Sequence, residues 1–115
     1  MNVEKLTFEV SAGTSPNEHV YRLHGPLVIT NIFAFQEALR SEAITTILDL
    51  TDVPYMDSAG LGVLTNSYVS HQKHGRKLVL VGANPRVQAL FQMTKLDQLF
   101  EVFPNVESAE LALAA

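Results

Sequence analysis

The 115-residue sequence contains no cysteine and no long apolar run. Without cysteine, the chain cannot form disulfides, thiolate metal sites or iron–sulfur clusters, and thiol redox chemistry is excluded. No apolar stretch approaches the roughly 20 residues that a membrane-spanning helix needs. Residues 1–5 show no basic stretch followed by an apolar segment, so we expect no signal peptide. We therefore expect a cytoplasmic domain without a membrane span.

Basic residues are also few. The chain has 8 Lys and Arg against 12 Asp and Glu, which gives a formal net charge of −4. This balance argues against direct nucleic-acid binding, which usually needs a basic surface. Hydrophobic residues make up 47% and charged residues 17%, so intrinsic disorder is excluded as the main state. With no internal repeat and no polar linker, the length predicts one domain over residues 1–115.

Alternation and short apolar runs predict the strands. Residues 6–10 and 20–24 alternate apolar with polar side chains, which predicts a half-buried hairpin. Residues 46–50 and 77–82 are mostly apolar, which is typical of strands buried on both faces. A short last strand is predicted at residues 102–103. Pro54 lies in the loop that follows the strand predicted at residues 46–50.

Helix signals fall between these strands. A helix should begin at Thr30 or Asn31, because both residue types favour the N-cap position. A longer one should run from about residue 57 to residue 74, with Gly75 at its C-terminal end. Asn84 followed by Pro85 predicts a third helix start. A last helix is expected over about 105–113.

The first of these helices has an apolar stripe. Ile32, Phe35 and Leu39 recur at helical spacing and should face inward. Phe33 falls off the stripe, near the loop expected beside residue 58. An exposed phenylalanine there could join a docking surface. We favour the alternative that the chain's own loop covers it.

Strands that alternate with helices predict βαβ units and parallel pairing. We therefore expect an α/β domain with a mixed, mostly parallel sheet, an N-terminal hairpin and about four helices packed mainly on one face. The clean alternation of the hairpin indicates that part of the other face is solvated.

The most distinctive segment is residues 55–62, Tyr-Met-Asp-Ser-Ala-Gly-Leu-Gly, which follows a buried strand and opens a helix. Asp57 and Ser58 are both favoured N-cap residues. The unpaired N–H groups of a first helical turn, together with the helix dipole, favour negative charge there. A phosphate on Ser58 would therefore meet backbone donors. Gly60 and Gly62 leave room for a partner to approach, or they only ease packing.

The same helix offers a second surface. Leu61, Leu64 and Tyr68 form the stripe that we assign to the core. Ala59, Val63, Asn66 and Ser70 should then lie on the opposite side. That face is small and uncharged, so a partner could come close to it, although an ordinary exposed face explains it equally well.

Residues 47–50 and 55–64 resemble the signature of STAS domains, specifically the bacterial anti-sigma factor antagonists. The similarity extends through residues 77–81, through 84–87 and the following helix, and through Gly25-Pro26-Leu27. It covers about residues 3–113. The run Asp-Ser-Ala-Gly-Leu-Gly between a strand and a helix is specific to the family.

The resemblance implies a protein-binding module that is not an enzyme and uses no cofactor. Members of the family bind an anti-sigma factor that is also a serine kinase using ATP, and so free a sigma factor. The kinase phosphorylates the serine after the aspartate, here Ser58, which releases the antagonist, and a serine phosphatase reverses the mark. The partner-binding residues implied are Asp57, Ser58, Ala59, Gly60, Gly62, Val63 and Asn66.

One position departs from the family. Members commonly carry an aspartate near the phosphorylated serine where this chain has Val28. This absence favours an alternative function, that of a constitutive, unphosphorylated STAS scaffold in a stress-signalling or lipid-transport complex.

Enzymatic alternatives have weaker support. A nucleophile elbow needs Gly two residues before the serine, and Met56 is there instead. His71 and His74 lie three apart, a spacing that could hold a metal. Their place near the end of a helix favours solvated surface positions, and we expect no metal site. Asp49 and Asp52 are expected in solvated or capping roles. There is no Walker-type phosphate loop, so ATP would belong to the partner.

Overall fold

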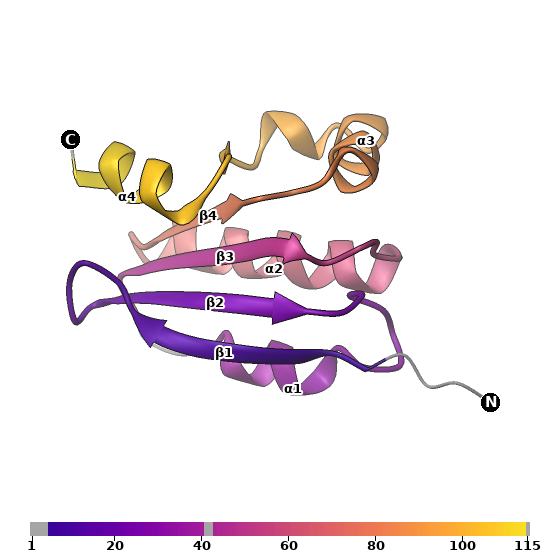
Figure 1. Cartoon of the computed structure of the whole chain (residues 1–115), viewed down its shortest axis with the longest axis horizontal. Helices are drawn as coiled ribbons and strands as arrows, with labels where there is room; N and C mark the ends of the chain where they lie inside the picture. The colour runs from indigo at the N-terminus through magenta and orange to yellow at the C-terminus, as the bar shows by residue number, and fades with distance from the viewer. Residues whose placement is uncertain (1–4, 41–42, 115) are drawn as a thin grey trace.

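A computed structural model describes residues 5–40 and 43–114, which form one five-stranded sheet with helices on both faces (Figure 1). The strands are β1 (Thr7–Ala12), β2 (Glu18–His24), β3 (Thr45–Asp52), β4 (Lys77–Val81) and β5 (Val102–Phe103). They lie in the order β1-β2-β3-β4-β5. The first pair is antiparallel and the other three pairs are parallel, which confirms the predicted hairpin and mixed sheet.

The helices follow the predicted order. They are α1 (Phe33–Ala38), α2 (Ser58–Lys73), α3 (Pro85–Met93) and α4 (Val106–Ala114), with a short 3-10 turn at Leu96–Gln98 that the sequence did not predict. Asn84 caps α3 by accepting the Val87 N–H at 2.8 Å. Gly75 follows α2 with a φ of +69°, a backbone angle that suits glycine.

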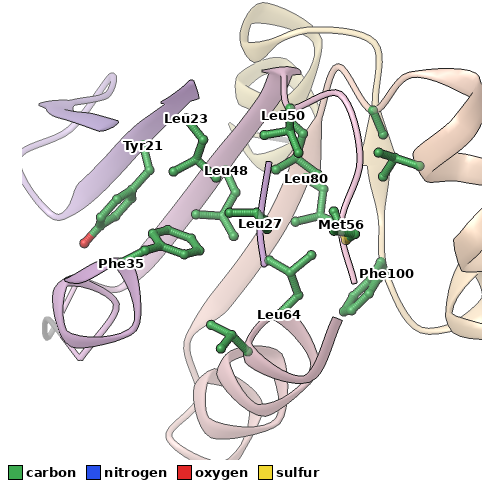
Figure 2. Packing of buried hydrophobic residues seen from close by; sticks show 14 of the residues in the cluster. Tyr21, Leu23, Leu27, Phe35, Leu48, Leu50, Met56, Leu64, Leu80 and Phe100 are labelled. Atoms are coloured by element: carbon green, nitrogen blue, oxygen red, sulfur yellow. The ribbon is translucent and has the colours of Figure 1, made fainter. Parts of the chain in front are cut away.

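Two apolar clusters lie on the two faces of the sheet. The larger one joins the sheet to α1, α2 and α3, and includes Tyr21, Phe35, Leu48, Leu64 and Leu80 (Figure 2). The smaller one lies beneath Ala109 of α4 and consists of Val20, Ile47, Val79 and Val81. Three helices therefore cover one face and α4 covers part of the other. β3 is central, and side chains on both of its faces are buried.

The cap of α1 differs from the prediction. The N-cap residue is Ile32, which makes no side-chain capping bond, and not Thr30 or Asn31. The Asn31 side chain is engaged in the preceding turn. Its Oδ1 accepts the Val28 N–H at 3.2 Å and its Nδ2 donates to the Pro26 carbonyl at 3.0 Å. Asn31 thus shapes the loop before α1 and does not begin the helix.

The side chain of Phe33 lies in solvent, so the expectation that the chain's own loop covers it is wrong. It is 69% exposed, whereas Ile32, Phe35 and Leu39 are buried as predicted. Phe33 is the first residue of α1, and its direction lies off the stripe that faces the sheet.

His71 is buried, which corrects the prediction of a solvated pair. Its Nδ1 donates to the Ser67 carbonyl at 2.7 Å, and its Nε2 lies 3.1 Å from the Thr46 hydroxyl of β3. Burial lowers the pKa of His71 below its usual value, so the ring is neutral and its Nε2 accepts a hydrogen bond from the Thr46 hydroxyl. His74 remains exposed, and its Nδ1 lies 2.8 Å from the Ser70 carbonyl of its own helix.

Within the described ranges, we find no helix that combines the length and the apolar character needed to cross a membrane.

Candidate functional site

The connection before α2 is held by the loop that follows β2. Leu27 N–H donates to the Tyr55 carbonyl at 3.2 Å, and Asp57 N–H donates to the Leu27 carbonyl at 3.1 Å. Leu27 and Met56 thus form a parallel bridge outside the main sheet. Figure 2 shows the Leu27 side chain among those of Leu48, Leu64 and Met56. The start of α2 is therefore built from two segments that are distant in the sequence.

Asp57 is the N-cap residue of α2 and also bonds the loop after β2. Its Oδ1 accepts the Gly60 N–H at 3.0 Å, and its Oδ2 accepts the Ile29 N–H at 3.1 Å. Burial alone would raise the pKa of the Asp57 carboxyl, but N–H bonds from Gly60, Ile29 and Ala59 outweigh it and lower the pKa. Asp57 is therefore a fixed anion at neutral pH.

Ser58 is the first residue of α2, and its side chain is exposed. Of the two candidate caps in the sequence, Asp57 takes the capping bond, so the Ser58 hydroxyl is left facing solvent. Ile29, whose N–H is bonded to Asp57, has a side chain that is 58% exposed. The loop that is bonded to Asp57, the residue before Ser58, thus carries the exposed apolar side chain of Ile29.

Ile29 is a site residue that the sequence analysis missed. Its exposure depends on the turn at residues 28–31, where Val28 is buried and Ile29 faces outward. Val28 and Ile29 are adjacent apolar residues in a loop, so hydrophobic periodicity cannot predict which of them is buried. Only the contact of this loop with Asp57 brings Ile29 to the site.

The two glycines of the first turn have different roles. Gly60 is buried, and a Cβ placed there would overlap the Leu27 carbonyl and press on the Leu27 side chain. A Cβ at Gly62 would meet nothing within 4 Å. Gly60 therefore permits the close packing of α2 on the Leu27 loop, while Gly62 leaves open space at the surface.

The buried stripe of α2 is wider than the predicted one. Leu64 is buried and Leu61 and Tyr68 pack against the core as predicted, but Gly60, Val63 and His71 are buried too, so the placement of Val63 on the exposed side is wrong. Gly60 lets this side of the helix approach Leu27 closely. Ser58 and Asn66 are exposed, and Ala59 and Gly62 are partly exposed. These four, with Asp57, remain at the candidate surface.

A shallow hollow of about 350 Å³ lies between the segment before α2 and α3. Tyr55 and Met56 line one side, and Arg86, Leu90 and Met93 line the other. The Arg86 guanidinium lies 5.0 Å from the centre of the Tyr55 ring, and Met93 is 81% exposed. The surface near Ser58 thus continues into an apolar depression with one cation.

The histidines do not assemble with Ser58 into a catalytic group. His24 bonds Glu9 and Asp52, and His71 bonds Thr46 and Ser67. Over residues 5–40 and 43–114, no three histidine or acidic side chains are placed so that they could hold a metal ion. Asp49 accepts bonds from the Thr51 N–H and hydroxyl, which is a local capping role.

The structure is a small α/β domain that presents a capped helix start with an exposed serine. Such a domain matches a known family over most of its length. The chain belongs to the STAS domain family, which matches residues 9–109.

Relatives and solved structures agree with this assignment. The anti-sigma-B factor antagonist of Listeria monocytogenes is 42% identical over 66 residues, which span 57% of this chain and 57% of that protein. An anti-sigma factor antagonist from Mycobacterium paratuberculosis has a similar structure, with a TM-score of 0.84, 21% identity, and coverage of 96% of this chain and 95% of that one.

A third likeness is to the Bacillus cell fate determinant SpoIIAA in its phosphorylated form. The TM-score is 0.73 at 18% identity, and the match covers 93% of this chain and 99% of that one. At this identity the two structures show a shared fold. The predicted fold class and family are thereby confirmed.

Proposed function

We propose that this chain is an anti-sigma factor antagonist, a binding regulator and not an enzyme, and that Ser58 is its phosphorylation switch. In the unphosphorylated state it binds an anti-sigma factor that is also a serine kinase, and so frees a sigma factor. The kinase supplies the ATP, and a serine phosphatase would restore the binding state. The names of the relatives support the general role.

The observation that carries this proposal is the geometry at the start of α2. The Ser58 hydroxyl is exposed, directly after a carboxylate that two main-chain N–H groups hold in place. A kinase can reach such a hydroxyl without unfolding the domain. The change that it makes is therefore confined to the surface.

The effect of the modification follows from charge. A phosphate adds about −1.5 to −2 charges beside the ionised Asp57. The Ile29 N–H is bonded to Asp57, and the exposed apolar side chain of Ile29 would be buried in a complex. Burying a phosphate in such a contact costs desolvation free energy and adds like-charge repulsion, so the phosphorylated form binds weakly.

Val28 favours a second candidate function. This side chain is buried, and the segment from Leu27 to Asn31 carries no carboxyl group beside Ser58. If the kinase needs an aspartate at this position, the chain acts as a constitutive STAS scaffold in a larger complex.

Intact-mass spectrometry separates the two functions. The protein is incubated with ATP and extract of its own cells, with Ser58→Ala as the control. The switch requires a mass increase of one phosphate that disappears in Ser58→Ala. No increase under several growth conditions, or an equal increase in the control, would contradict Ser58 as the switch and favour the scaffold.

Binding to the purified serine-kinase anti-sigma factor of the same genome then tests whether negative charge at residue 58 weakens the complex. Ser58→Asp should weaken the complex at least about tenfold, which corresponds to about 1.4 kcal/mol. Ser58→Ala should bind regardless of ATP. Equal affinity of Ser58→Asp and wild type would show that charge at this position does not control the complex.

A further inference from the structure

Glu18, the first residue of β2, is a buried carboxyl group far from the α2 start. Its side chain is only 6% exposed, which is uncommon for glutamate. The Thr14 N–H donates to Glu18 Oε2 at 2.9 Å. Gly13 has no side chain, and a Cβ there would overlap the Glu18 carboxyl. The turn between β1 and β2 is thus folded around this group.

A second carboxyl group reaches the same point from α4. Glu110 Oε2 also accepts the Thr14 N–H at 2.9 Å, and the Thr14 hydroxyl donates to Glu18 Oε2 at 3.4 Å, so the two carboxyl groups converge on one residue. Because both oxygens lie 2.9 Å from the same nitrogen, the two carboxyl groups are close neighbours. Two ionised carboxylates cannot bond each other, because neither carries a proton to donate. The close approach of the two groups is therefore more favourable when one of them carries a proton.

The surrounding charges do not replace that proton. Thr45, the register neighbour of Glu18 in β3, is uncharged, and Lys77 lies one strand further in the same register. Within the described chain, neither Glu18 nor Glu110 is in an ion pair. Glu107 of α4 is a further negative charge, and His19 points to the opposite face of the sheet.

We propose that Glu18 and Glu110 share one proton and form a pH-sensitive latch that holds α4 against the β1–β2 turn. With the proton in place, α4 covers the apolar side chains of Val20, Ile47 and Val79 on its face of the sheet. When the proton leaves, two anions face each other at Thr14, and α4 loosens.

The direction of the pH dependence follows from the environment. Burial raises the pKa of Glu18, the Thr14 N–H partly offsets this, and the Glu110 carboxyl raises it further. A group whose pKa is raised by folding stabilises the folded state at acidic pH. That contribution is lost as the pH rises through the raised pKa.

Glu110→Gln tests the latch, with Glu107→Gln as the matched control. Each variant removes one negative charge from α4, but only residue 110 contacts Glu18. A glutamine amide can donate to the Glu18 carboxylate without a proton. At pH 7 the melting temperature of Glu110→Gln should exceed that of Glu107→Gln by about 2–5 °C, and the difference should vanish toward pH 4.5.

Hydrogen exchange locates the effect. Protection factors of the α4 amides should fall in wild type between pH 5 and pH 7, and should stay constant in Glu110→Gln. Glu18→Gln, which changes the other partner, should also abolish the pH dependence. The proposal is overturned if Glu110→Gln and Glu107→Gln melt alike at every pH, or if α4 protection in wild type does not change with pH.

Discussion

Two carboxyl groups near opposite ends of β2 join neighbouring elements, Glu18 at the start of the strand and Asp57 bonded to the loop that follows it, and their pKa values shift in opposite directions. Beyond the carboxyl end, Asp57 receives N–H bonds from Gly60 and Ile29, and its pKa is lowered. At the amino end, Glu18 shares a single N–H with Glu110, and its pKa is raised.

The balance between burial and hydrogen bonding decides the difference. Main-chain donors to both oxygens outweigh burial at Asp57, whereas at Glu18 burial and the nearby Glu110 carboxyl outweigh the donors of Thr14. The glycines next to the two carboxyl groups, Gly60 and Gly13, also differ in what surrounds them. A Cβ at Gly60 would meet the backbone of Leu27, and a Cβ at Gly13 would meet the flexible end of Glu18. The α2 start is therefore rigid, while the contact to α4 can change.

The largest expected effect is that of Gly60→Ala. The new Cβ would press on the Leu27 carbonyl, which is itself bonded to Asp57, so the helix start must shift. We expect a loss of about 1–3 kcal/mol in the free energy of unfolding. Urea unfolding at pH 7 measures it.

The control is Gly62→Ala in the same helix. Nothing lies within 4 Å of that Cβ, so the change should be neutral or should stabilise by up to about 1 kcal/mol. If the two variants are equally stable, the close approach to Leu27 does not constrain the helix start.

Asp57→Ala comes next in size. It removes the cap and the bond to Ile29, which should cost about 1–2 kcal/mol in the free energy of unfolding at pH 7. Because folding lowers the pKa of Asp57, its charge stabilises wild type above about pH 4. This contribution is lost as the pH falls through the lowered pKa.

The difference between Asp57→Ala and wild type should therefore shrink in acid. Urea unfolding at pH 7 and pH 3 measures the trend, with Ser58→Ala as a control that leaves the cap intact. A difference that grows in acid would show that the ionised carboxylate is not what stabilises the helix start.

The smallest effect is expected for His24→Gln at the end of β2. The ring nitrogens lie 2.9 Å from Glu9 and 2.8 Å from Asp52. Hydrogen bonds to Glu9 and then to Asp52 raise the pKa of His24, so its contribution to stability is present below about pH 6.5. It fades as the pH rises through the raised pKa.

Because these groups are exposed, solvent and salt screen the ion pairs, and the change in melting temperature should be small. Thermal unfolding at pH 5.5 and pH 9, at low and high salt, measures it. A large difference that does not depend on pH or salt would mean that His24 acts through packing and not through its charge.

Local patterns were enough to predict most of the elements. The alternation in β1 and β2, the apolar runs of β3 and β4, and Asn84-Pro85 at α3 each produce the expected structure. These features depend on residues that are neighbours in the sequence. The site itself was predicted as far as Asp57 and Ser58, because capping chemistry is also local.

Contacts between distant segments could not be predicted in the same way. His71 is buried because Thr46 of β3 offers it a hydroxyl partner. Val63 is buried because Gly60 lets this side of α2 approach Leu27 closely. Ile29 joins the candidate surface through its N–H bond to Asp57. None of these pairings leaves a periodic signal in the sequence.

The sequence by itself therefore determined most of the strands and helices, the STAS signature, and the serine at a helix start that Asp57 caps. Hydrophobic periodicity and N-cap chemistry act over a few residues, and single-chain patterns record them directly. Only the tertiary structure decided which groups of α2 are exposed, and that two glutamates far apart in the chain meet at Thr14. Such contacts depend on the distances between packed helices and strands. These distances result from the packing of the whole domain and not from residues that are neighbours in the sequence.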